Sequence, residues 1–152
     1  MATGTEQKKR FDEVVRCGRD PEYFINTYVK IQHPVNGLVP FKLYRYQCAV
    51  IREYVNNRLN IVLKARQLGI TTATAAYALW LCLFYKDKIV YAIATKLDVA
   101  KTLMRKVKKM LSHLPPGLVM PTVLVDAAQR LEFSNGSSIT VAPTAEDVGL
   151  SE

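Results

Sequence analysis

The segment from Lys64 to Thr72, KARQLGITT, has the residue types of a loop that binds phosphate. It follows a short β-branched run and precedes a long apolar stretch, so we expect a strand before it and a helix after it. A loop in that place directs backbone N–H groups and the N-terminus of the next helix at a phosphate. Gly69 permits close approach of the backbone, and Thr71 supplies a hydroxyl of the kind that binds magnesium.

The segment departs from the common phosphate-loop pattern GxxxxGK[ST] at two positions. Ile70 stands where that pattern has lysine, and Lys64 stands where it has the first glycine. Positive charge would therefore reach a phosphate from the start of the loop, through Lys64 or Arg66. Taken alone, the segment favours a simpler interpretation, a strand-to-helix connection with solvent-facing basic residues.

The composition is typical of one folded globular domain or part of one: 152 residues, 49% apolar and 22% charged. A net charge of +8 favours anionic partners such as nucleic acid, nucleotides or an anionic membrane surface. Three cysteines without a CxxC pattern indicate reduced thiols, and no metal site is predicted at either histidine. The N-terminal residues lack the apolar core of a signal peptide, and the longest apolar stretch, residues 73–85, is shorter than the roughly 20 residues that cross a bilayer. No membrane partner is predicted.

Helix and strand signals alternate along the chain. Asp20 and Pro21 open a helix that we expect to end by His33, because a proline follows it. The later elements are predicted as a helix over 43–58, a strand over 60–63, a helix over 71–84, a strand over 88–94 covered on both faces, and a helix that runs from a Thr95–Asp98 capping box to His113.

Residues 130–134 and 137–141 alternate across Asn135-Gly136, which predicts a β-hairpin. Strands and helices follow one another in the order expected for right-handed crossovers between parallel strands. The fold class predicted is therefore α/β, with a mostly parallel sheet and helices on both faces.

Several stretches resemble the large subunits of tailed-phage terminases, the motors that package DNA. They are the deviant loop itself, DPEYFINTYVKI over residues 20–31, HPVNGLVPFKLYRYQ over 33–47 and LEFSNGSSI over 131–139. The resemblance runs from about residue 17 to the end. It implies a P-loop NTPase-like fold of the RecA/ASCE type with a β-hairpin insertion, incomplete at the C-terminus. Residues 1–40 would form a helical lead-in and residues 41–152 the first half of the ATPase core, with the nuclease domain absent.

The resemblance also implies roles for residues of the loop, with ATP and Mg²⁺ as cofactors. The positions that match the family's triphosphate contacts are Lys64, Arg66, Gln67, Gly69, Thr71 and Thr72. Thr71 would bind the magnesium ion, and Arg66 would also stabilise charge in the transition state.

Tyr46 and Gln47 match the place where the family reads adenine. A glutamine amide offers a donor and an acceptor to the adenine edge, and a tyrosine offers a stacking face. For Tyr46 we favour a position in the core instead, because it lies on the apolar stripe of its predicted helix.

The family's motor needs a strand that ends in an aspartate followed by a glutamate, and no such pair is recognised here. Asp126 ends an apolar run, but Ala127 follows it and the run precedes the hairpin, so we exclude it from that role. Val148 and Leu150 flank Gly149 where many relatives carry an arginine, which puts an arginine finger there in doubt. Efficient turnover and DNA cleavage are therefore not expected of this chain alone.

The predicted helix over 97–114 has a basic outer face, made of Lys101, Arg105, Lys106, Lys108 and Lys109. These residues could contact DNA phosphates, but we favour a solvated face, which is routine on helices that cover a sheet.

The resemblance implies ATP-driven packaging of double-stranded DNA, with the portal and the small terminase subunit as partners, a ring homo-oligomer when full length, and the host-cell cytoplasm as location. Two other functions stay open: a non-catalytic remnant or split-gene piece, and a DNA-binding module that uses the basic helix. An incomplete sheet would expose apolar surface, so we expect marginal stability or self-association.

Overall fold

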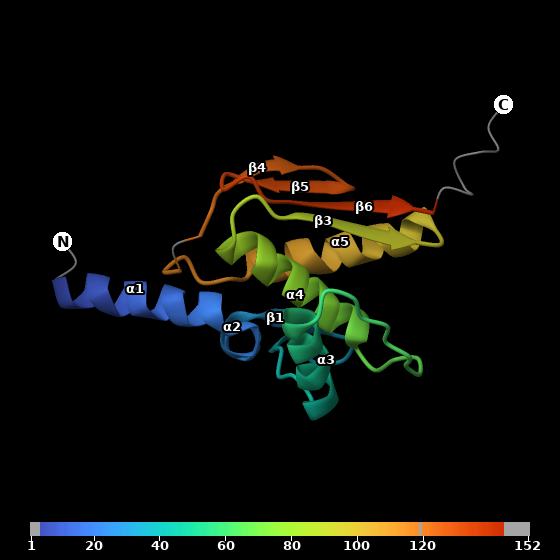
Figure 1. The fold of residues 1–152 in the computed structure, drawn as a ribbon, viewed down its shortest axis with the longest axis horizontal. Coiled ribbons are helices and arrows are strands. Elements are labelled where there is room, and N and C mark those ends of the chain that lie inside the picture. The colour runs from blue at the N-terminus through green and yellow to red at the C-terminus, as the bar shows by residue number, and fades with distance from the viewer. Residues whose placement is uncertain (1–3, 119, 145–152) are drawn as a thin grey trace.

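A computed structural model describes residues 4–118 and 120–144 as a sheet with helices beneath it (Figure 1). The helices are α1 (Gly4–Arg19), α2 (Pro21–Tyr28), α3 (Arg45–Asn56), α4 (Ile70–Phe84) and α5 (Leu97–Ser112). The strands are β1 (Lys30–His33), β2 (Gly37–Pro40), β3 (Ile89–Ala94), β4 (Val123–Asp126), β5 (Arg130–Phe133) and β6 (Ser138–Pro143). The α/β class, the helices over 43–58, 71–84 and 97–113, the strand over 88–94 and the hairpin are confirmed within a few residues at each end.

The four-stranded sheet has the order β3-β6-β5-β4 and is mixed. Only β3 and β6 pair in parallel, while β5 runs antiparallel to both β4 and β6. The prediction of a mostly parallel sheet was therefore wrong. Consecutive strands joined by short turns pair antiparallel. The crossover through α5 leads from β3 to β4 at the far edge of the sheet, and two such turns then bring β6 beside β3.

The described helices cover one face of this sheet, so the prediction of helices on both faces was also wrong (Figure 1). On β3, Val90, Ala92 and Ala94 are half-buried on the side of α5, whereas Ile89, Tyr91 and Ile93 point the other way and are each about two-thirds exposed. The continuous apolar run of β3 thus has one covered face and one open face.

The helix predicted to end by His33 ends at Tyr28. Residues 30–33 instead form β1, which pairs antiparallel with β2 from Lys30 opposite Pro40 to His33 opposite Gly37. Gly37 has a φ of 69° at the end of the tight turn. An extended partner strand thus offers this segment a ladder of hydrogen bonds that outweighs its helical pattern.

The strand predicted over residues 60–63 does not form. Ile61 and Leu63 are fully exposed, and no strand among the described residues lies beside them. A strand is stable only when a neighbour takes up its N–H and C=O groups, so a β-branched run alone leaves this segment as an extended connection.

The capping box predicted for α5 is also absent. The helix begins at Leu97, so Lys96 occupies the N-cap position and makes no side-chain capping bond. Thr95 therefore lies one residue too early to cap the first turn.

The core lies around α4, which packs against α5, the sheet and the N-terminal helices. Its alanines and its leucines Leu79 and Leu83 are buried. Trp80 donates from Nε1 to the carbonyl of Cys17 at 2.8 Å, which ties α4 to α1. This buried helix provides a rigid base for the loop that precedes it.

Candidate functional site

The loop from Lys64 to Gly69 leads directly into the N-terminus of α4. Gln67 and Gly69 have φ values of 62° and 67°, in the left-handed region, so the chain turns sharply just before the helix. Gly69 is the N-cap residue and has no side chain to bond the first-turn N–H groups. These groups therefore remain for a ligand, and the partial positive charge of the helix N-terminus favours an anion.

Two side chains of α3 form hydrogen bonds to the backbone of the loop. The Tyr46 hydroxyl and the Gln47 Nε2 both donate to the carbonyl of Leu68, each at 3.0 Å. Gln47 is 2% exposed, and its Oε1 accepts from the backbone N–H of Tyr44 at 3.0 Å. Gln47 thus fastens the start of α3 to the loop that precedes α4.

The placement of Tyr46 in the core was wrong. Its side chain is 42% exposed and stacks on Tyr44, with ring centroids 5.6 Å apart and 9° between the ring planes. The buried face of α3 consists of Gln47 and Ile51, so Tyr46 lies at its edge, where its hydroxyl reaches a carbonyl. The predicted adenine contact of Tyr46 and Gln47 stays a prediction, and here both ends of the Gln47 amide are occupied by backbone groups.

The remaining predicted site residues lie at the mouth of the loop. Lys64, Arg66 and Gln67 are exposed, and within the described residues the Lys64 ammonium donates only to the carbonyl of Ala65, at 3.3 Å. Thr71, in the first turn of α4, is exposed as well. The structure thus brings the basic side chains and the predicted magnesium ligand to one solvent-facing loop.

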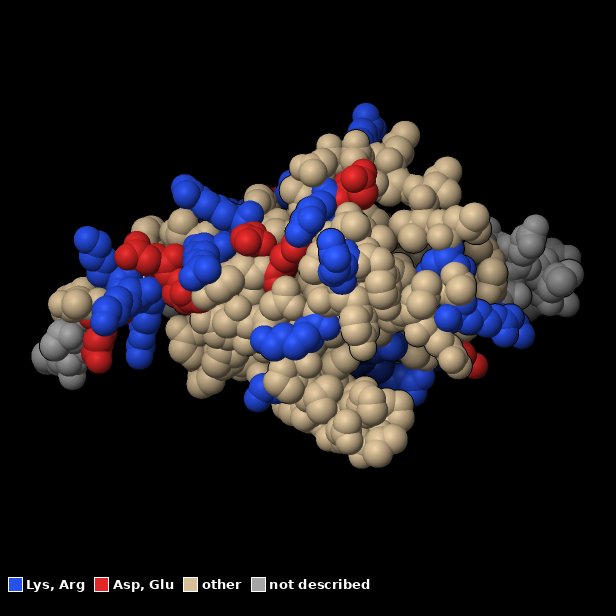
Figure 2. All heavy atoms as spheres, turned by 90° about the horizontal axis from the view of Figure 1, so that it is seen from below, with Lys and Arg blue, Asp and Glu red and all other residues tan. Residues whose placement is uncertain are grey.

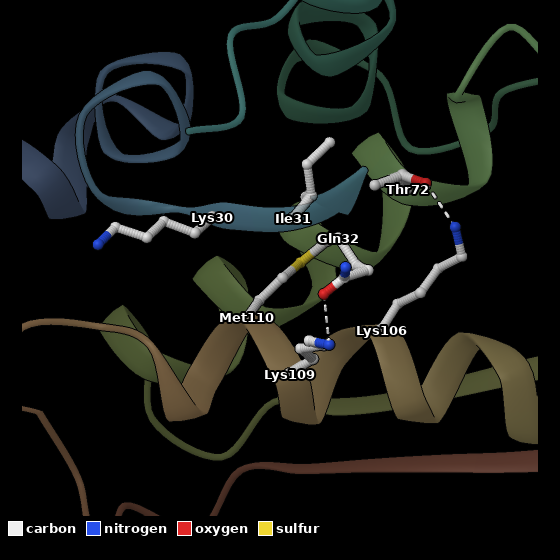
Figure 3. Close-up of a pocket in the computed structure, with 7 residues that line it drawn as sticks. All are labelled: Lys30, Ile31, Gln32, Thr72, Lys106, Lys109 and Met110. Carbon is white, nitrogen blue, oxygen red and sulfur yellow. Dashed lines mark hydrogen bonds between the residues drawn. The ribbon is translucent and has the colours of Figure 1, made fainter. Parts of the chain in front are cut away.

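Thr72 faces α5 rather than the mouth of the loop. Its Oγ1 accepts a hydrogen bond of 2.8 Å from the ammonium of Lys106 (Figure 3). The sequence pattern predicted Lys106 only on the outer face of its helix. Its spacing to Leu103 and Met110, three before and four after, places it at the border of the buried stripe and is the signal for this contact.

The basic face of α5, for which we favoured a fully solvated position, makes several contacts with other elements. Lys108 forms an ion pair with Asp126 and donates to the carbonyl of Ala127 at 2.5 Å, while Lys109 donates to Gln32 Oε1 at 2.7 Å. Asp126 lies at the end of the edge strand β4, where its ion pair with Lys108 gives it a structural role.

Positive charge is spread over the helical side of the molecule. Figure 2 shows Lys and Arg side chains across this face, whereas most visible Asp and Glu side chains gather toward the N-terminal end.

No helix among the described residues is long and apolar enough to span a membrane. Burial raises the pKa of the thiols of Cys17 and Cys82 to about 12, so both are protonated packing residues at neutral pH. The segment 146–151, discussed for an arginine finger, lies outside the described residues.

A protein-family model matches residues 61–150, which is more than half of the chain. The matching family is described as terminase large subunit, T4likevirus-type, N-terminal. The match includes the whole loop, α4, β3, α5 and the β5–β6 hairpin, and it begins after Tyr46 and Gln47.

Proposed function

Because the chain belongs to this family of terminase large subunits, which indicates a role in phage DNA packaging, we propose that it is the N-terminal ATPase-domain portion of a packaging motor. In this proposal it binds ATP with Mg²⁺, and the complete motor uses hydrolysis to drive double-stranded DNA into a capsid. The portal, the small terminase subunit and other copies in a ring would be the partners of that motor.

The geometry of the loop carries the proposal. The family match begins three residues before Lys64, and the loop turns through Gln67 and Gly69 into a helix whose first turn is uncapped. Backbone N–H groups in such a turn, together with the helix N-terminus, bind the oxygens of a phosphate chain. This arrangement supports nucleotide binding despite the missing lysine at position 70.

Two side chains of the loop and one of the first turn of α4 have proposed roles. Lys64 and Arg66 are exposed and have no carboxylate partner among the described residues, so both are available to neutralise phosphate charge. Arg66 would also stabilise the transition state. Thr71 would contribute its hydroxyl to the magnesium ion, as the hydroxyl of a standard phosphate loop does.

We propose binding without efficient turnover for this chain. In its sequence we recognise no apolar strand that ends in the aspartate–glutamate pair used by the family. The nearest imitation, Asp126, is paired with Lys108 at the edge of the sheet. Lys64, Arg66 and Thr71 do not include a carboxylate, so none of them can activate water as the family's glutamate does.

Calorimetric titration with Mg-ATP tests the proposal. We expect binding by the wild-type chain and a loss of roughly tenfold or more in affinity for Lys64→Ala and for Thr71→Ala, since each removes one charge-assisted or metal contact. Lys8→Ala, an exposed lysine on α1, is the matched control and should bind like wild type. For Thr71→Ala the loss should vanish when magnesium is omitted.

The opposite outcome is equally informative. If circular dichroism shows a folded chain that produces no heat with Mg-ATP, the nucleotide site is refuted. The non-catalytic alternative would then describe this chain better.

A further inference from the structure

A cavity of about 190 Å³ lies between β1, the first turn of α4 and the outer side of α5 (Figure 3). Ile31 and Met110 form its apolar wall. The polar groups that line it are the side chains of Lys30, Gln32, Thr72, Lys106 and Lys109. We refer to it as the lysine cavity.

The lysine cavity has positive charge and no carboxylate in its lining. Lys106 and Lys109 donate to the neutral oxygens of Thr72 and Gln32, at 2.8 and 2.7 Å. An ammonium has three donors, so each of these lysines keeps two for a ligand. Lys30 also lines the cavity, and its side chain extends away from both of these lysines in Figure 3.

Three basic residues among the described ones have carboxylate partners, and none of the three lines the cavity. Lys108, one position from Lys109, is paired with Asp126, and Arg52 is paired with Glu22. The cavity lining itself contains three lysines and no carboxylate, so positive charge is in local excess there. Several uncompensated cations around one concave site attract an anion and raise its local concentration.

We propose that the lysine cavity binds a phosphate group. Lysine ammonium groups bind phosphate as point charges, and the Gln32 amide and Thr72 hydroxyl can donate further hydrogen bonds. The volume is below the roughly 300 Å³ at which sites for drug-sized ligands begin, so a phosphate fits better than a whole nucleotide. The site lies on the α5 side of Thr72 and does not depend on ATP binding at the loop.

Two sources of phosphate share this chemistry, a nucleic-acid backbone and free phosphate. Binding to a labelled DNA duplex, measured by fluorescence anisotropy over a series of NaCl concentrations, tests the first. Calorimetric titration with inorganic phosphate tests the second. Both are measured on the wild-type chain and on two double variants.

The cavity variant is Lys106→Gln with Lys109→Gln. The control is Lys96→Gln with Lys101→Gln, which removes the same charge from the same region of the chain at positions that do not line the cavity. Lys109→Gln alone is measured as well, because Lys109 is exposed and its replacement should leave the fold intact even if the double variant does not fold.

If a DNA phosphate occupies the cavity, the negative slope of log K against log salt should become shallower by about 0.9 in the cavity variant. The slope of the control variant should stay at the wild-type value. If free phosphate is the ligand, its affinity should fall roughly tenfold or more in the cavity variant with no change in the duplex slope. Lys109→Gln should show part of either effect.

The proposal is overturned if the cavity and control variants lose the same affinity for the duplex and for phosphate, or if the wild-type chain binds neither ligand. A Mg-ATP titration run alongside separates this result from the nucleotide proposal. If the wild-type chain does not bind Mg-ATP, and Lys109→Gln binds phosphate or duplex more weakly than wild type does, the nucleotide site is refuted and the lysine cavity is supported.

Discussion

Gly69 lies where its backbone conformation and the Gln47 side chain leave no room for a Cβ. Its φ is 67°, and a Cβ at this position would come within 2.8 Å of Gln47 Nε2. Gln47 cannot easily move, because it is buried and both ends of its amide are hydrogen-bonded to backbone groups. The shape of the loop therefore depends on a glycine and on one glutamine from another helix.

Gly69→Ala is expected to lower the free energy of unfolding by about 1–2 kcal/mol, the cost of a left-handed residue with a Cβ, and the contact with Gln47 adds to this. Urea denaturation measures the change. Gly117→Ala is the matched control, since a Cβ there meets nothing within 4 Å and φ is not positive. Equal stability of the two variants would show that the turn before α4 relaxes without cost.

At the scale of elements, α1 and α2 are joined through the carboxylate of Glu13. It accepts hydrogen bonds from the hydroxyls of Tyr28, at 2.6 Å, and Tyr23, at 2.7 Å. These bonds, from Tyr28 first and then Tyr23, hold the pKa of Glu13 below its ordinary value. The charged carboxylate is thus favoured in the folded state relative to the unfolded state.

A lowered pKa in the folded state gives a stabilisation that is fully present above the unfolded value, about 4.3, and is lost as pH falls through the folded value. We expect Glu13→Gln to lower Tm at neutral pH, and the gap to wild type to narrow as the pH falls below about 4.3. Thermal melts across the pH range measure this. Tyr28→Phe removes one of the donors, and its difference in Tm from wild type should narrow in the same pH range. If the Tm difference of both variants does not change with pH, the role of Glu13 is contradicted.

The whole molecule leaves one face of its sheet open. Ile89, Tyr91 and Ile93 alternate along β3 on the side away from α5, and each is about two-thirds exposed. A contiguous apolar surface of this kind promotes association. The apolar exposure expected from an incomplete sheet is present, whereas marginal stability and self-association stay predictions.

Sedimentation velocity over a range of concentrations should show self-association of the wild-type chain. Ile89→Thr with Ile93→Thr should reduce it and keep the strand, with a change of less than about 0.5 kcal/mol in unfolding free energy, because these side chains are exposed. Val90→Thr, on the covered side of β3, is the control and should cost about 1 kcal/mol without reducing association. A wild-type chain that stays monomeric at every concentration would contradict the prediction.

Periodicity and turn chemistry were sufficient to predict α3, α4, α5 and the hairpin at Asn135-Gly136, because an amphipathic stripe and a left-handed turn are local properties of the chain. The order of these elements also identified residues 64–69 as a loop before a helix. Other contacts arise only on folding, because the partners lie more than twenty residues apart: those of the Tyr46 hydroxyl, Gln47 Nε2 and the Lys106 ammonium. Residues 60–63 show the same dependence, since a strand exists only where another strand supplies its hydrogen bonds. Local pattern thus determined which segments are helical and which loop precedes α4, whereas pairing and packing between distant segments decided the mixed sheet, its open face and the lysine cavity.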